Sequence, residues 1–115
     1  MKTKDPVNQP LIDVYEEVGL QPLGLMNNSV WLEDPRRLVF TLSRYKFVSK
    51  MLTGVSNVAE VGCGDGFGAR IVKQSVSNLT ITDYDGGFIE AFKKDLYSED
   101  WPIDSFVHDI LAAPL

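Results

Sequence analysis

The chain has 115 residues, of which 44% are hydrophobic and 23% are charged, which is typical of one folded domain. Its formal net charge is −5 and its isoelectric point is about 4.7, which argues against the extended basic surface of most nucleic-acid-binding proteins but leaves room for a small basic patch. Cys63 is the only cysteine, which excludes an internal disulfide. The sequence contains neither an apolar signal-peptide core nor a stretch of roughly 20 apolar residues that could span a membrane. We therefore expect a cytoplasmic protein that binds neither nucleic acid nor membrane.

The first expected element is a short helix that begins at Pro10 and ends before Gly19. Proline is tolerated at the first helical position, and glycine commonly follows the last. The apolar residues between them recur with the spacing of one helix face: Leu11, Val14, Tyr15 and Val18. Prolines and glycines interrupt the next segment, so we expect a loop over residues 20–34.

A longer helix is expected over residues 35–52, with Asp34 as its N-cap and Pro35 as its first residue. Gly54 follows its end. Apolar residues form two stripes along this helix, and five basic residues are interspersed among them: Arg36, Arg37, Arg44, Lys46 and Lys50.

Beyond Gly54 the pattern changes to short apolar or β-branched runs that alternate with helical segments. We expect strands over residues 57–61, 79–83 and 104–110, and helices over residues 67–76 and 86–96. Strands that alternate with helices form right-handed crossovers, and these place the strands side by side in a parallel sheet. The sequence therefore predicts the α/β class, with N-terminal helices followed by about three parallel strands in the order 3-2-1.

Four glycines occupy every second position of the bend that follows the first expected strand: Gly62, Gly64, Gly66 and Gly68. Nucleotides bind at such bends in open α/β sheets, because glycine lets the backbone approach a ligand closely. A dinucleotide pattern would place its last glycine where Phe67 stands, and no Lys follows as a P-loop requires. The carboxylates of Glu60 and Asp65 would repel a pyrophosphate and favour a cationic ligand.

The stretch "AEVGCGDGFG", residues 59–68, resembles motif I of the class I methyltransferases that use S-adenosylmethionine. The resemblance covers residues 58–115 and implies an incomplete Rossmann-like sheet. It also implies a helical N-terminal region over residues 1–54 and a partial S-adenosylmethionine-binding domain over residues 55–115. The cofactor carries a sulfonium cation, an amino group and a carboxylate, which agrees with the acidic residues at the bend.

The same resemblance implies roles for the acids at the ends of the second and third strands. In the family the second strand ends in an acid that binds the ribose hydroxyls, and here Asp83 matches it, while Asp85 is better placed to cap the next helix. The third strand often ends in an acid that meets the adenine amino group, which corresponds to Asp109, with the Ile110 backbone beside it. Tyr84 would lie against the adenine ring.

Further residues of the implied cofactor site come from the bend and from the long N-terminal helix. Glu60 would orient the bend and balance the cofactor's amino group. The family's N-terminal cap can place an "RY" pair at the cofactor's carboxylate, which makes Arg44 a candidate. Cys63, Gly62, Gly64 and Gly66 complete the implied set. No catalytic residue is identified, and no metal-ligand pattern is present.

Domains of this family have about six or seven strands, whereas this sequence predicts three. It therefore resembles the first half of a methyltransferase, and the methyl acceptor cannot be read from it. The first strand would expose an unpaired edge, so we expect a homo-oligomer unless the N-terminal helices cover that edge. Two alternatives stay open: a fragment of an NAD(P)-dependent oxidoreductase, and a non-catalytic, oligomerising half-domain with a vestigial nucleotide site.

Overall fold

The computed structural model describes all 115 residues. It contains three strands and five α-helices. A short 3-10 turn, η1, precedes α1, and one π-helical turn, η2, continues α5. In chain order the elements are η1 (Pro6–Asn8), α1 (Gln9–Val18), α2 (Leu25–Glu33), α3 (Pro35–Met51), β1 (Asn57–Val61), α4 (Ala69–Lys73), β2 (Asn78–Asp83), α5 (Gly86–Ala91), η2 (Phe92–Leu96) and β3 (Asp104–Val107).

The three strands form one open, all-parallel sheet in the order β1-β2-β3. Ile81 in the central strand aligns with Glu60 of β1 on one side and with Ser105 of β3 on the other. This arrangement confirms the predicted α/β class and the predicted order of the strands. β1 is an edge strand, because it hydrogen-bonds only to β2; its pairing with another chain stays a prediction.

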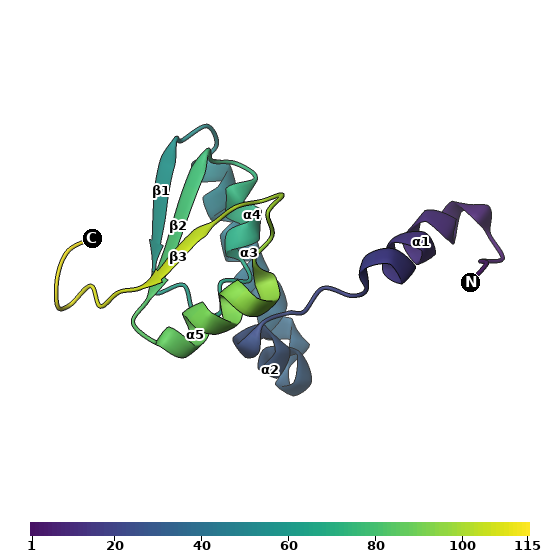
Figure 1. Cartoon of the computed structure of the whole chain (residues 1–115), viewed down its shortest axis with the longest axis horizontal. Coiled ribbons are helices and arrows are strands. Elements are labelled where there is room, and N and C mark those ends of the chain that lie inside the picture. Colours follow the sequence, from purple (N-terminus) through teal and green to yellow (C-terminus); the bar gives the residue numbers. More distant parts are fainter.

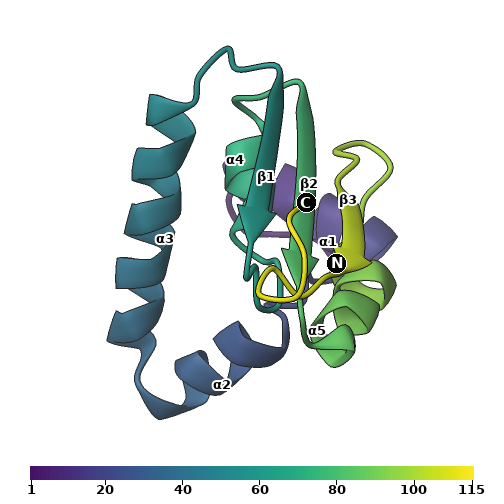
Figure 2. The same cartoon turned by 90° about the vertical axis from the view of Figure 1, so that its left-hand side faces the viewer.

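One face of the sheet is covered by helices, and the hydrophobic core lies there. Figure 2 looks onto the opposite face, which no helix covers and in front of which the C-terminal segment runs. Leu79 and Ile81 of β2 point into the core, whereas Thr80 and Thr82 alternate to the other face. The buried cluster consists of Cys63, Ala69, Val72, Val76, Leu79, Ile81, Ile89, Phe92 and Ile103.

The N-terminal arm, residues 1–24, differs from the body, residues 25–115. α1 forms close to the predicted residues, and Gly19 follows its last residue with a positive φ of 76°. No residue of α1 is buried, and Figure 1 shows the helix standing apart from the body on an extended segment. No helix of the chain is both long enough and apolar enough to cross a membrane.

The predicted loop over residues 20–34 is wrong for its second half, which forms helix α2. The reason is a tertiary contact, because the carboxylate of Asp65 accepts hydrogen bonds from the backbone N–H groups of Met26 and Asn27. These N–H groups lie in the first turn of α2 and have no partner within the helix. Asp65, which is distant in sequence, therefore caps α2, and the local sequence of this helix contains no signal that predicts it.

The other predicted elements are present, several with shorter bounds. α3 begins at Pro35 as predicted, and the Asp34 side chain accepts a hydrogen bond from the backbone N–H of Arg36 at 3.2 Å. α4 covers only the middle of the predicted helix over residues 67–76, and β3 ends at Val107 rather than at Ile110. The last residues of that predicted strand, His108 to Ile110, instead form the segment that leaves the sheet.

Candidate functional site

The glycine-rich bend between β1 and α4 is fastened to the carboxyl end of β2. The backbone N–H groups of Gly62 and Cys63 both donate to the carbonyl oxygen of Thr82, at 2.8 and 2.9 Å. The N–H of Gly64 donates to Oδ2 of Asp83 at 2.9 Å. The bend therefore lies at the carboxyl edge of the sheet, where parallel α/β folds place their ligands.

The glycines of the bend are needed for different physical reasons. Gly62 has φ of +75°, and a Cβ built on it would meet nothing within 4 Å, so this backbone borders open space. At Gly66 a Cβ would come within 2.7 Å of the Phe92 ring, so core packing requires glycine there. At Gly68 the ring of Tyr45 occupies the place of a Cβ. Gly62 therefore leaves room beside the bend, whereas the Cβ position of Gly66 points into the core; the close approach of a ligand to the backbone of either glycine stays a prediction.

A cavity of about 620 Å³ lies between α3, β1 and the bend. This volume is within the range of small-molecule sites. Apolar residues from α2, α3 and the sheet form much of its wall, including Val30, Val48, Leu52 and Leu79. The structure brings five of the predicted site residues to this cavity: Arg44, Glu60, Gly62, Cys63 and Gly64.

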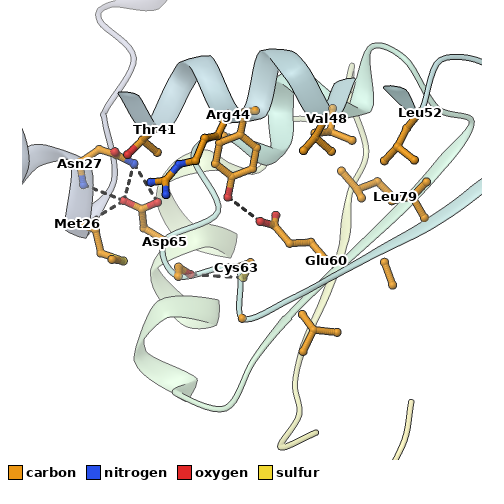
Figure 3. Close-up of a pocket in the computed structure, with 18 of the residues that line it drawn as sticks. Met26, Asn27, Thr41, Arg44, Val48, Leu52, Glu60, Cys63, Asp65 and Leu79 are labelled. Atoms are coloured by element: carbon orange, nitrogen blue, oxygen red, sulfur yellow. Dashed lines mark hydrogen bonds between the residues drawn. The ribbon is translucent and has the colours of Figure 1, made fainter. Parts of the chain in front are cut away.

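Glu60 points from β1 into the cavity, toward α3 (Figure 3), and its carboxylate has one hydrogen-bond partner. Tyr45 Oη donates to Glu60 Oε2 at 2.6 Å. Burial raises the pKa of Glu60, the hydrogen bond from Tyr45 opposes this rise, and the charge of Asp65 adds to it. Burial also raises the pKa of the Tyr45 hydroxyl, followed by its bond to Glu60, so Tyr45 stays protonated and acts as the donor.

Tyr45 was not among the predicted site residues, although it is the second residue of the "RY" pair that made Arg44 a candidate. Its ring packs where Gly68 lacks a side chain, and its hydroxyl meets a carboxylate on a strand. Gly68 was the one sequence signal for this contact, because a glycine at the start of a helix leaves space for a large neighbouring side chain.

Asp65 closes the cavity on the side of α2. The residue is buried, and its carboxylate accepts hydrogen bonds from the Met26 and Asn27 N–H groups and from Asn27 Nδ2, all at 3.0 to 3.1 Å. The N–H of Phe67 donates to the same carboxylate at 3.1 Å. These bonds satisfy the buried charge and fix the start of α2 beside the bend.

Asp83 is buried at the end of β2, and its side chain points at the bend. One oxygen accepts from Gly64 N–H and the other from the N–H of Asp85, both at 2.9 Å. Each carboxylate oxygen has a second lone pair available for a ligand hydroxyl. Asp85 itself caps α5, because its Oδ1 accepts from the N–H of Gly87 at 2.9 Å. The predicted helix cap by Asp85 is therefore confirmed, and ribose binding by Asp83 stays a prediction.

The other five predicted site residues do not line the cavity: Gly66, Asp83, Tyr84, Asp109 and Ile110. The last three lie in the segments that follow β2 and β3. All three are exposed, and the Tyr84 side chain is 76% accessible. Asp109 Oδ1 accepts from the N–H of Leu111 at 2.9 Å. The N–H of His108 donates to the carbonyl oxygen of Asp83 at 3.0 Å, which holds the segment after β3 next to the end of β2.

The charges around the bend are mostly negative. Glu60 and Asp65 line the cavity with the single cation Arg44, which projects into it from α3 (Figure 3). Burial, with the charges of Glu60 and Asp83, raises the pKa of Cys63 to about 12, so this residue is a neutral thiol near pH 7. No group of three or more His, Cys, Asp or Glu side chains is arranged to hold a metal ion.

No protein-family model matches the chain, and no curated protein matches it in sequence. The class that the fold and site define is an α/β protein with an open parallel sheet and a cavity beside its glycine-rich bend.

Proposed function

We propose that this chain is the S-adenosylmethionine-binding half of a methyltransferase with a Rossmann-like sheet, acting in the cytoplasm. The observation that carries the proposal is the position of Asp83, a buried acid at the end of β2 that contacts the glycine bend through Gly64. An acid at this place can accept hydrogen bonds from the two hydroxyls of a ribose.

The residues present fit the charge of this cofactor. Its amino group and sulfonium are positive and its carboxylate is negative, while the cavity offers Glu60, Asp65 and one cation, Arg44. The open space above Gly62 leaves room for a ligand at the bend. Along the edge of the sheet, Asp109 and the Ile110 backbone would bind the adenine base, and the Tyr84 ring would pack against it.

When bound, S-adenosylmethionine supplies a methyl group on a positively charged sulfur, which an acceptor attacks. The residues of this chain would hold and orient the cofactor: Asp83 at the ribose, Glu60 at the amino group and Arg44 at the carboxylate. Orientation and the exclusion of water account for much of the rate enhancement in such transfers. No side chain is assigned as a catalytic base, and the acceptor is open.

Calorimetry of the full chain with S-adenosylhomocysteine tests this proposal. We expect saturable binding that Asp83→Asn weakens by about tenfold or more, equivalent to ~1.4 kcal/mol. Asp104→Asn is the matched control, because Asp104 is an exposed acid at the opposite end of the sheet, at the start of β3. Circular dichroism of each variant verifies that the bend variant is folded.

Absence of binding to S-adenosylhomocysteine, or equal weakening by both variants, would contradict the proposal. Binding of NADH instead would favour the oxidoreductase alternative, even though Phe67 stands where its pattern needs glycine. Binding of neither nucleotide would favour the non-catalytic half-domain.

A further inference from the structure

The cavity between α3 and β1 offers more room than the proposed cofactor would fill. Four residues proposed to hold the adenosyl group do not line it: Asp83, Tyr84, Asp109 and Ile110. Only the methionyl part of the cofactor would therefore enter the cavity, beside the bend. The cavity volume of about 620 Å³ is that of a site for a whole small molecule. Space for a second ligand is therefore left beyond the bend.

This cavity exists because α3 is anchored to α4 and touches β1 at only one polar contact. Ser49 Oγ on α3 donates to the carbonyl oxygen of Ile71 in α4 at 3.2 Å. The one hydrogen bond between α3 and β1 runs from Tyr45 Oη to Glu60 Oε2. The two elements are therefore bridged at this pair, and the gap beside the pair stays open.

The two ends of the cavity differ in polarity. One end is walled by apolar side chains from α3, β1, α4 and β2: Val48, Leu52, Val58, Val72 and Leu79. In Figure 3, Val48, Leu52 and Leu79 lie on one side of Glu60, and Arg44 lies on its other side. A ligand group that enters the first end must be apolar, because a polar group there would lose its hydrogen bonds to water without replacement.

Glu60 is the carboxylate of the cavity that keeps unused acceptor capacity. Tyr45 donates to its Oε2, and its Oε1 has no hydrogen-bond partner within the chain. Asp65, in contrast, accepts five hydrogen bonds from α2 and the bend. Glu60 is half-buried beside the apolar wall. Such a carboxylate favours a charged donor, because charge-assisted hydrogen bonds are stronger than neutral ones.

We propose that this cavity binds a small amine with an apolar body, its ammonium group at Glu60 and its body between α3 and β1. The apolar body gains free energy by leaving water, in contact with Val48, Leu52 and Leu79. A neutral alcohol of the same shape would leave the charge of Glu60 uncompensated. An anion of the same shape would be repelled by it.

The amine is also the methyl acceptor, a role that rests on the proposed function. Its ammonium group first passes one proton to the Glu60 carboxylate. The freed nitrogen lone pair then forms the bond to the methyl carbon, and the electron pair of the broken carbon–sulfur bond stays on sulfur. The products are a methylated ammonium ion and a neutral thioether. A carboxylate has about four lone pairs, so Glu60 can accept from Tyr45, the cofactor's amino group and the amine together.

Nuclear magnetic resonance titration of the full chain, without nucleotide, tests this site with three probes of one shape. The probes are 2-phenylethylamine, 2-phenylethanol and 3-phenylpropanoate, which differ in charge. We expect the amine to bind at least about fivefold more tightly than the alcohol, and the anion to bind most weakly. Glu60→Gln should reduce the affinity for the amine to that for the alcohol. Glu90→Gln is the matched control, because Glu90 is an exposed acid on α5, away from the cavity.

A second variant tests the position of the apolar body. Val48→Trp should fill the apolar end and weaken binding of the amine and the alcohol alike by at least about fivefold. Val48 is 39% exposed, so a larger side chain can be accommodated without loss of the fold. Val39→Trp is the matched control, since Val39 is an exposed residue of the same helix that does not line the cavity.

Four results would overturn the proposal: no saturable binding of any probe, an amine that binds no more tightly than the alcohol, a preference for the amine that survives Glu60→Gln, and binding that ignores Val48→Trp. Failure of the chain to bind S-adenosylhomocysteine is a separate result. It would remove the role of the amine as methyl acceptor and leave the amine site itself in place.

Discussion

The arm and the body use the same kinds of residue with opposite outcomes. Leu11 in α1 is 70% exposed, whereas Ile81 in β2 is completely buried. Both positions belong to regular apolar patterns, and both patterns correctly predicted their element. The difference is the partner: helices cover one face of the sheet, but nothing in the chain covers α1. A local pattern therefore specifies an element, and tertiary packing supplies most of its stability.

The largest expected effect of a substitution lies in the core of the body. Ile81→Ala should lower the free energy of unfolding by about 3 to 4 kcal/mol, because it leaves a cavity at a fully buried site. Leu11→Ala is the matched change in the arm and should cost less than about 0.5 kcal/mol at concentrations where the chain is monomeric. Urea denaturation measures both, and similar losses would refute the contrast between arm and body.

The next largest effect concerns the hydrogen bonds between the Asp65 carboxylate and the first turn of α2. Asp65→Ala should lower the free energy of unfolding by about 2 to 3 kcal/mol, because buried N–H donors lose their acceptor. Amide hydrogen exchange should accelerate most in α2, by more than the common increase that a less stable fold gives to core amides such as those of β2. Asp85→Ala removes the exposed N-cap of α5 and should lower the free energy of unfolding by only about 1 kcal/mol. Unchanged exchange in α2 would show that the helix does not depend on Asp65.

A smaller effect follows from the raised pKa of Glu60. Because burial disfavours the charged form in the folded state, the stability that Glu60 contributes is fully present below its ordinary pKa of 4.5. That stability is lost as the pH rises through the raised pKa. Glu60→Gln should therefore unfold at higher urea concentration than the wild type at neutral pH, with the difference vanishing near pH 3.

Tyr45→Phe is the companion variant for Glu60. It removes the hydrogen bond that favours the carboxylate, so the pKa of Glu60 should rise further and the loss of stability between acid and neutral pH should grow. A Glu60→Gln variant that is no more stable than the wild type at neutral pH would refute this account of the pair.

The sequence predicted most of the body because its signals are local. Alternating β-branched residues identified β2, and Asp34 followed by Pro35 identified the start of α3. It did not predict α2, because the acceptor for the first turn of that helix is Asp65, far along the chain. The bounds of α4 and β3 were also too wide, since propensity does not define where tertiary contact ends an element.

The candidate site was predicted in part. The bend, Glu60 and Arg44 meet at one cavity, and Asp83 contacts the bend. The contact between Gly66 and the Phe92 ring was not predicted, because the two residues are distant in sequence. The bond between Tyr45 and Glu60 was missed for the same reason, since no local pattern connects a helix to a strand across a cavity.

Nuclear magnetic resonance of the labelled full-length chain, titrated with S-adenosylhomocysteine, tests the central claim most directly. The account predicts saturable shifts of the backbone amides of Gly62, Gly64, Tyr84 and Ile110, which follow the three strands, and none in α1. Shifts confined to other surfaces, or no saturable shift, would contradict the claim that the carboxyl edge of this sheet binds an adenosyl group.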